Sequence, residues 1–351
     1  AGLAGCGQRG GPKPTRGTTE RPEDVRDPER PPDAEGEDGT ALPSLESVDT
    51  TRDYVYLNDI PPDNFNGELA LAMASQDDGI DLRGFLHEFP PVPWWDSEEK
   101  YETAKSYYKK HHRLTHDRAV ESGFSDLPPA QYGLFERHRK PESGEIADTE
   151  PIGSPGTNVI IEAARDASPQ NPLVVAVGGP VCTVADAYLR DPSIADSVVV
   201  FWRTLPPWGE LWNMALSGWS ATVVVKKLRT VICFDDGSAR ITREQIEERL
   251  PDEPLKQYIL NKEYDGSGQN PLSDGEKYEG DANTILSPCH PDTRAEVGNL
   301  RFEELKSHWR LGPVMPELAQ TTELTNITAV RKHRNMSERW WSHMGSESAW
   351  G

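Results

Sequence analysis

The sequence predicts an α/β protein with a mainly parallel central sheet flanked by helices, and three observations carry this prediction. Residues 173–177 (LVVAV) form a continuous apolar run rich in β-branched residues, which is typical of a strand buried on both faces. Residues 178–180 (GGP) interrupt the run, and residues 181–189 then carry apolar residues at helical spacing. Residues 197–201 form a second apolar run, which completes a βαβ unit. Because ligands bind at the carboxyl ends of parallel strands, the 178–180 loop is expected at the edge of a site.

The first part of the folded domain repeats this pattern. Tyr54–Leu57 is a short strand pattern, and a polar, proline-broken loop from Asn58 to Gly67 follows it. Glu68–Ala74 is a strong helix former, and Leu82–His87 is a second strand pattern. Ser97–Ser122 has the spacing of one long amphipathic helix. This stretch therefore adds a second βαβ unit.

The remaining elements are predicted from weaker patterns. Gly123 to Gly156 has little apolar periodicity and is expected to be irregular, as is the polar stretch from Asp252 to Glu279. The other expected elements are helices at Asn158–Ala167, Ser217–Lys227, Thr242–Leu250 and Asp281–Leu286 and a strand at Thr230–Phe234. The C-terminal third shows weak periodicity, and its tryptophans, Trp340, Trp341 and Trp350, have no predicted place.

Composition limits the partners. A formal net charge of -21 and a pI near 4.9 argue against a nucleic-acid backbone, because binding phosphates requires a basic surface. A small neutral or cationic ligand is compatible with this charge. The four cysteines, Cys6, Cys182, Cys233 and Cys289, show no CxxC spacing, so the spacing indicates no zinc site. Nothing in the sequence indicates an oligomeric state.

The N-terminal residues divide the chain into a tail, 1–50, and a folded domain, 51–351. Leu3-Ala4-Gly5-Cys6 resembles the lipobox of bacterial lipoproteins, although the charged and most of the apolar part of such a signal are missing. The tail has almost no large apolar residues and is expected to be disordered. Two interpretations remain open: a tether to a lipid anchor at Cys6 in the bacterial cell envelope, or the ordinary tail of a soluble protein. Membrane contact is expected only through such a lipid, since no later stretch is apolar for long enough to span a bilayer.

Several motifs, taken in order, resemble the nucleoside hydrolases of the inosine–uridine-preferring type. That family has an aspartate cluster before an ALAL-like helix start, and Asn58–Gly67 followed by ELAL occupies this place. The family's central loop and following helix are similar to Val177–Pro192, and its E-F-N element is similar to Glu210–Asn213. The late H-D-P-L-A-V element corresponds to Gly280–Ile285. The resemblance covers about two thirds of the chain, from Val55 to Leu286.

The resemblance implies a definite chemistry. Such enzymes hold one Ca²⁺ that binds the ribose hydroxyls and the attacking water, and an aspartate takes a proton from that water. Cleavage of the C–N bond then passes through an oxocarbenium-like sugar. Carried onto this sequence, the resemblance implies Asp59, Asp63, the Cys182 carbonyl and Asp281 as metal ligands. It implies Asp63 and Asn66 as catalytic residues. The residues expected to bind a nucleoside or sugar-like ligand are Asn64, Trp94, Glu210, Trp212 and Asn213.

The sequence departs from the family pattern at the aspartates. The two adjacent aspartates fall on Asn66 and Gly67, and the late histidine falls on Gly280. Because Ca²⁺ affinity follows the number of charged ligands, these losses argue against the ion that the resemblance implies. The general base is also missing unless Asp63 or Glu68 replaces it.

Each candidate also has a structural interpretation. Asp59, Asp63 and Asp281 are common residue types in turns and helix caps, and Gly178 and Gly179 are turn glycines. The tryptophans near the site are equally compatible with packing. The histidines of the long helix, His111, His112 and His116, have a metal-like spacing, but a solvated charged face is the favoured interpretation.

Two functions of different class follow. The first is an enzyme that hydrolyses the N-glycosidic bond of a nucleoside or related glycoside. The second is an inactive, envelope-tethered relative that binds a sugar or nucleoside. Calcium binding and base release from nucleosides separate them.

Overall fold

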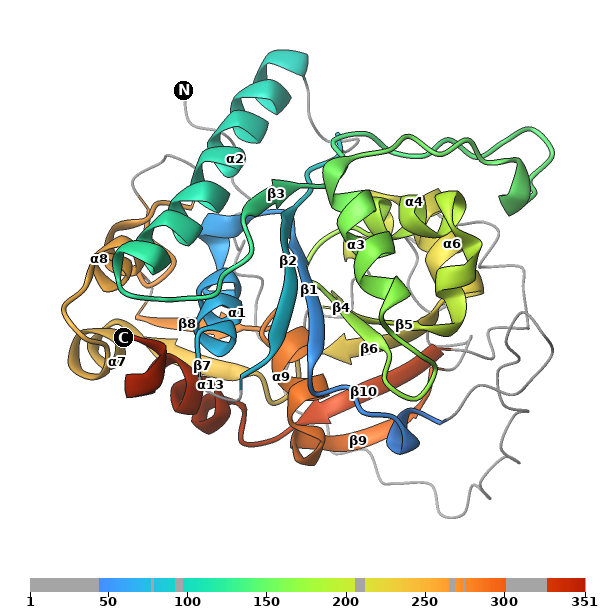
Figure 1. Ribbon diagram of the computed structural model, residues 1–351. Helices are drawn as coiled ribbons and strands as arrows, with labels where there is room; N and C mark the ends of the chain where they lie inside the picture. The colour runs from blue at the N-terminus through green and yellow to red at the C-terminus, as the bar shows by residue number, and fades with distance from the viewer. Residues whose placement is uncertain are drawn as a thin grey trace, which may run out of the picture.

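Eight strands form one sheet in the order β3-β2-β1-β4-β5-β6-β10-β9, and helices cover both of its faces (Figure 1). This computed structural model describes residues 44–76, 79–91, 97–205, 212–264, 269–273, 275–300 and 327–350. Neighbouring strands run parallel except for the antiparallel pair β9 and β10. The predicted fold class, a mainly parallel sheet flanked by helices, is confirmed.

The strands of this sheet are β1 (Asp53–Asn58), β2 (Asp81–His87), β3 (Ala130–Tyr132), β4 (Leu173–Val177), β5 (Val198–Leu205), β6 (Arg229–Phe234), β9 (Arg294–Asn299) and β10 (Ile327–His333). A separate antiparallel pair consists of β7 (Ala239–Thr242) and β8 (Glu276–Glu279). The α-helices are α1 (Asn66–Ala74), α2 (Glu98–Glu121), α3 (Pro155–Arg165), α4 (Cys182–Arg190), α5 (Trp212–Leu216), α6 (Gly218–Lys227), α7 (Arg243–Arg249), α8 (Pro254–Asn261), α9 (Asn283–Cys289) and α13 (Met336–Met344). Short 3₁₀ turns occur at Leu45–Ser47, Pro61–Asp63, Ile146–Asp148, Pro192–Asp196, Pro291–Thr293 and Glu347–Ala349.

Alternate residues of the central strands enter two different cores. In β1, Tyr54 and Tyr56 pack on one face with α1, α9 and α13, while Val55 and Leu57 pack on the other face with α3, α4 and α6. This alternation follows from the period of two along a strand. Because both faces are covered, the central strands are apolar at nearly every position, which is the pattern that made β4 recognisable.

The predicted elements up to Thr242–Leu250 agree with the structure within a few residues. The strand at 173–177 has the predicted ends, whereas β5 continues four residues past its predicted end at 201. Helix α3 begins three residues early because Ser154 caps it and Pro155 occupies its first turn. Ser154 Oγ accepts a hydrogen bond from Thr157 N at 3.0 Å. Capping, rather than apolar spacing, sets this helix start.

The polar stretch 252–279 and the excursion 123–156 are less irregular than predicted. The structure has α8 and β8 in the first and β3 in the second, where β3 extends the sheet beside β2. Strands β3 and β8 are short and mostly only partly buried, so they carry little hydrophobic periodicity. Helix α8 does bury Leu255, Ile259 and Leu260, a short apolar pattern within a polar stretch. Tertiary pairing forms the two strands.

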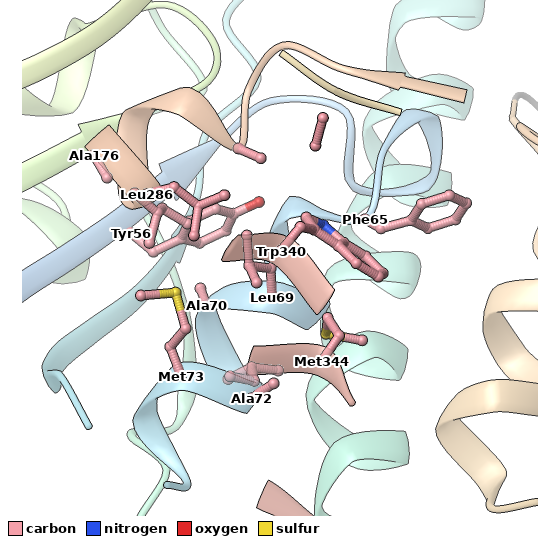
Figure 2. Close-up of a cluster of buried hydrophobic side chains, with 14 of the residues drawn as sticks. Tyr56, Phe65, Leu69, Ala70, Ala72, Met73, Ala176, Leu286, Trp340 and Met344 are labelled. Atoms are coloured by element: carbon pink, nitrogen blue, oxygen red, sulfur yellow. The ribbon is translucent and has the colours of Figure 1, made fainter. Parts of the chain in front are cut away.

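The C-terminal tryptophans complete the core on the α1 face of the sheet. Trp340 lies on α13 near Leu69, Ala70 and Ala72 of α1, as Figure 2 shows. Trp340 has no exposed surface, and Trp341 and Trp350 are also buried. Their role is therefore packing, which the weak periodicity of this region concealed.

The predicted tail, residues 1–50, lies almost wholly outside the described residues. Within the part of the chain that the structure describes, no helix combines the length and the apolar character that a membrane span requires.

Candidate functional site

The loops that follow β1 and β4 meet at the carboxyl edge of the sheet. The two strands are hydrogen-bonded neighbours, and Gly178 N donates to Leu57 O at 3.0 Å. A Cβ atom on Gly179 would lie 2.6 Å from Asp59 Cγ, and one on Gly178 would lie 3.0 Å from Asp281 Cγ. Glycine is therefore required here by the close approach of two carboxylates to the backbone.

Three predicted aspartates lie near one another, and two of them, Asp59 and Asp281, contact this loop. Asp59 and Asp281 are buried and Asp63 is partly exposed. Burial, followed by the nearby carboxylates of Asp63 and Asp281, holds the pKa of Asp59 well above its ordinary value. Burial raises the pKa of Asp63 too, and burial together with the charge of Asp63 raises the pKa of Asp281 to about 6, although Arg203 opposes the shift. The structure thus brings together carboxylates that disfavour one another's charge.

Asn64 links two of these carboxylates. Its amide nitrogen donates to Asp281 Oδ2 at 2.8 Å and also to Asp63 Oδ1. Its amide oxygen accepts from Asn66 N at 3.1 Å. Asn58, the last residue of β1, accepts from Asp59 N at 2.6 Å. Asn64 therefore joins two of the carboxylates by hydrogen bonds, and its contact with a ligand stays a prediction.

Arg203 on β5 is the cation of the cluster. Its guanidinium donates to both carboxylate oxygens of Asp235, at 2.8 and 2.9 Å, and to Asp281 Oδ1 at 2.8 Å. Although burial lowers it, the charges of Asp281 and Asp235 hold the pKa of Arg203 well above its ordinary value. A quarter of the Arg203 side chain is exposed, 24%, while its two partners are buried.

Asn213 and Trp202 hold the glycine loop in place. Asn213 Nδ2 donates to Gly178 O at 2.9 Å and to Arg203 O at 2.7 Å. Trp202 Nε1 donates to Gly179 O at 2.8 Å. Both loop carbonyls are thus engaged, and only the amide oxygen of Asn213 is left for the predicted contact with a sugar.

The donor set does not fit the calcium ion that the resemblance implies. Both oxygens of Asp281 already accept hydrogen bonds, one of them from the guanidinium of Arg203. Among the described residues, the three aspartates do not place oxygens within 4.8 Å of one another. Calcium needs six to eight oxygens at 2.3–2.6 Å, and a cation would also face the positive charge of Arg203. The chemistry of these side chains is therefore considered without calcium.

Cys182 was predicted to offer its carbonyl to that ion. It begins α4, so its carbonyl belongs to the first turn of the helix, while its N–H faces Glu88 at 3.1 Å. Glu88 also accepts from Thr183 N at 2.7 Å and from Thr183 Oγ1. Burial raises the pKa of Glu88 to about 8 despite these donors. The amino end of α4 is thus capped by a carboxyl group from the end of β2.

Glu68, the alternative general base, forms a buried ion pair with Lys262. Its Oε1 accepts from Lys262 Nζ at 2.7 Å, and both side chains are buried. Lys262 also donates to Asn64 O, which ties α8 to the aspartate loop. Because Glu68 is paired in this way, the partly exposed Asp63 is the remaining candidate for the general base.

Asn66, predicted as catalytic, is the first residue of α1 and has no exposed surface. Neither atom of its amide has a hydrogen-bond partner among the described residues. Buried polar groups are rarely left unpaired, so this amide is unusual.

Three other predicted ligand contacts lie outside the described side chains. Trp94 and Glu210 lie outside the described residues, and Trp212 begins α5 without a described side chain.

The helix histidines are not on a solvated face. His112 is buried, stacks on Phe85 with ring centroids 4.4 Å apart, and its Nε2 lies 3.2 Å from Phe85 O. His111 is buried with its Nδ1 2.8 Å from Tyr258 Oη. The favoured interpretation of a solvated face is wrong for these two residues. Neither belongs to a group of three metal-ligating side chains within the described ranges.

Sequence reasoning missed Arg203, Asp235, Glu88 and Glu279 in and beside the site. Glu279 accepts from Phe65 N at 3.0 Å, and burial raises its pKa to about 7. Glu88 and Asp235 directly follow β2 and β6, so position at the carboxyl edge of the sheet was the available signal for these two. Arg203 lies inside β5, and Glu279 ends β8 of the separate antiparallel pair, so that signal did not apply to them.

A hollow of about 180 Å³ lies elsewhere, between α3 and the end of α4. It is lined mainly by charged and polar side chains, including Arg165 and Arg190, and holds none of the site residues.

Comparison with solved structures shows the fold that surrounds this site. No protein-family model and no curated protein matches the chain. The structure resembles a plant nucleoside hydrolase (TM-score 0.51, 11% identity, covering 83% of this chain and 99% of that one). It resembles a purine-preferring ribonucleoside hydrolase from Gardnerella vaginalis to a similar degree (TM-score 0.51, 12% identity, 85% and 100%). The effector protein XOO4466 is also similar (TM-score 0.51, 10% identity, 87% and 95%). At these identities the likeness establishes a nucleoside hydrolase-like α/β fold.

Proposed function

We propose that this chain hydrolyses the N-glycosidic bond of a nucleoside or a related glycoside. The observation that carries the proposal is that Asp59 and Asp281 lie against the 178–179 loop, with Asp63 beside them through Asn64, at the carboxyl edge of the sheet of a nucleoside hydrolase-like fold. Buried carboxylates with raised pKa values, held close together, are typical of functional sites.

The charge of the cluster suits this reaction. Cleavage of a C–N bond to the sugar develops positive charge on the sugar ring in an oxocarbenium-like transition state. The cluster is negative when its acids are ionised, because its acids outnumber the nearby cations, which are Arg203, Lys262 and Lys277. The acids are Asp59, Asp63, Glu68, Asp235, Glu279 and Asp281. A fixed negative field stabilises the transition state more than the neutral substrate.

Asp63 is the proposed general base. It is the most exposed of the three carboxylates, so water can reach it. A raised pKa makes its carboxylate a stronger base near neutral pH than an ordinary aspartate. Asp59 and Asp281 would face the sugar, and the hydrogen bonds from Asn64 would fix the positions of the Asp63 and Asp281 carboxylates relative to each other.

The unpaired amide of Asn66 supports ligand binding at the same loop. An unmade buried hydrogen bond costs about 1–3 kcal/mol, which a hydroxyl or water in the site would recover. Trp94, Glu210 and Trp212 remain predicted contacts to the base and sugar.

The experiment is release of free base from a panel of purine and pyrimidine nucleosides by the full chain. Asp63→Ala should lower kcat at least 100-fold, because general base catalysis contributes on the order of 10²–10⁴-fold. Asp252→Asn, at an exposed position, is the matched control and should keep full activity. Absence of base release with every nucleoside, alongside measurable nucleoside binding, would favour the inactive binding relative.

Calcium is tested in the same assay. Because Arg203 occupies the position beside Asp281, treatment with a chelator should leave kcat unchanged. A loss of activity that Ca²⁺ restores would show that Arg203 moves aside for the ion.

The envelope location predicted from Leu3–Cys6 has a separate test. Cys6→Ser should move an anchored protein to the soluble fraction, and retention of the variant in membranes would contradict the anchor.

A further inference from the structure

A second cluster of chemically reactive side chains lies at the far end of α9 from Asp281. Cys289 ends α9, His290 caps that end, and His343 comes from α13. One ligand atom from each lies within 4.8 Å of the other two, and all three residues are half-buried. In the part of the chain that the structure describes, no other three His, Cys, Asp or Glu side chains meet this closely.

Gln76 determines which nitrogen of His343 carries the proton. Gln76 Nε2 donates to His343 O at 2.7 Å, which identifies its Oε1 as the atom 2.8 Å from His343 Nδ1. His343 Nδ1 must therefore carry the hydrogen and donate it to Gln76. In the neutral ring, Nε2 then carries a lone pair, which accepts a hydrogen bond from His290 Nε2 at 2.7 Å.

This arrangement is one that metal-ligating histidines use. A ligating imidazole almost always donates its other N–H to an oxygen that fixes the ring orientation, and Gln76 supplies that oxygen. A thiolate and two imidazole nitrogens favour zinc over hard cations such as Ca²⁺ and Mg²⁺, which prefer oxygen ligands.

We propose that Cys289, His290 and His343 bind one Zn²⁺ ion that joins α9 to α13, with water as the fourth ligand. Zinc bonds to nitrogen are about 2.0–2.1 Å long, so two nitrogens at a tetrahedral ion lie about 3.3 Å apart. The two imidazoles therefore need to separate by less than about 1 Å from their 2.7 Å contact. Binding forms one Zn–S and two Zn–N bonds and releases the Cys289 thiol proton to solvent, while His290 gives up its Nε2 hydrogen and carries one on Nδ1 instead, so that Nε2 can ligate the ion.

Arg339 places a positive charge near all three ligands, and its ion pair with Asp292 offsets part of that charge. This pair is formed through an Nη2–Oδ2 contact of 2.8 Å. The ligands come from two segments far apart in sequence, which explains why cysteine spacing indicated no zinc site. The ion would tie the last helix of the described chain to the core, and its place is independent of the site around Gly178.

The test is titration of the metal-free full chain with Co²⁺, which replaces Zn²⁺ and reports thiolate ligation by a charge-transfer band. We expect one Co²⁺ per chain, displacement by Zn²⁺, and a higher Tm with Zn²⁺ present. Cys289→Ser, which is close in size, should abolish the charge-transfer band, and His343→Asn should weaken binding at least tenfold. Gln76→Ala should lower the affinity about 10–100-fold without removing a ligand.

Cys6→Ser is the matched control, because it removes a thiol outside the described residues, and it should leave the band intact. The proposal is overturned if the full chain shows no cobalt–thiolate band, or if the band persists in Cys289→Ser. If His343→Asn fails to fold, Cys289→Ser and Gln76→Ala decide the matter.

Discussion

Asp186 on α4 and Asp281 before α9 are both buried carboxylates, yet their surroundings shift their pKa values in opposite directions. Asp186 accepts hydrogen bonds from Ile152 N at 2.7 Å, Gly153 N at 2.9 Å, Thr157 Oγ1 at 2.7 Å and His138 Nε2 at 3.1 Å. Although burial raises the pKa of Asp186, these donors, His138 first, bring it below its ordinary value.

Asp281 accepts from Arg203 and Asn64 but faces the charge of Asp63, and burial first of all raises its pKa to about 6. The first carboxylate anchors the 123–156 excursion to the core, and its charge is fully satisfied. The second stands among like charges, which is unfavourable for stability. Because this repulsion lowers stability, a catalytic or binding role is the best explanation for the presence of the cluster.

The largest effect is expected where the site cluster loses its cation. Arg203→Met leaves Asp235 and Asp281 buried without their partner, which should lower the free energy of unfolding by about 3–5 kcal/mol. Denaturant unfolding at pH 7 measures this, with Arg203→Lys as the control that keeps the charge. A loss below about 1 kcal/mol would show that the carboxylates are protonated or solvated without Arg203.

A somewhat smaller loss is expected at the anchoring carboxylate. Asp186→Ala removes the acceptor of four donors, and each unsatisfied buried donor costs about 1–3 kcal/mol before relaxation and water entry. We expect a net loss of about 2–4 kcal/mol in the free energy of unfolding. Limited proteolysis should also cut the 123–156 segment faster. Unchanged stability would mean that Asp186 is not the anchor.

The dependence of stability on pH is a further test of the contrast between carboxyl groups with lowered and with raised pKa values. Glu88, Glu279 and Asp281 have pKa values raised to about 8, 7 and 6, so the folded chain retains protons that the unfolded chain releases near pH 4. Their contribution is therefore present at low pH and is lost as pH rises through these values.

The free energy of unfolding should accordingly fall by a few kcal/mol between pH 5 and 8, since a pKa that differs by one between the folded and unfolded chain corresponds to about 1.4 kcal/mol. Glu88→Gln keeps the shape of the side chain without the charge and should flatten the upper part of this slope. A series of unfolding curves across pH measures it. Stability that rises over this range in the native chain would contradict the burial of these acids in protonated form.

The sequence predicted the scaffold of strands and helices better than it predicted the site. The strands β1, β4 and β6 were predictable because burial on both faces makes them continuously apolar. The pair β7–β8 and the C-terminal strands were not, because their formation depends on partners distant in the chain. Trp340 could not be placed for the same reason.

In the site, Asp59, Asp63 and Asp281 could be selected from loop position and from the family resemblance. Arg203 could not, since it lies within a strand and acts only through Asp235 and Asp281, from two other segments. Its presence is what changes the interpretation of the site from a calcium centre to an ion-paired carboxylate cluster.

The most direct test of the central claim is a paired measurement on Asp59→Asn at pH 8: unfolding by denaturant and base release from nucleosides. The substitution removes a buried carboxyl group whose charged form burial, Asp63 and Asp281 all disfavour. We predict stability that is unchanged or higher by up to about 2 kcal/mol, together with a loss of activity of at least about 100-fold. Loss of stability with activity retained would contradict the claim, because Asp59 would then serve the fold rather than the reaction.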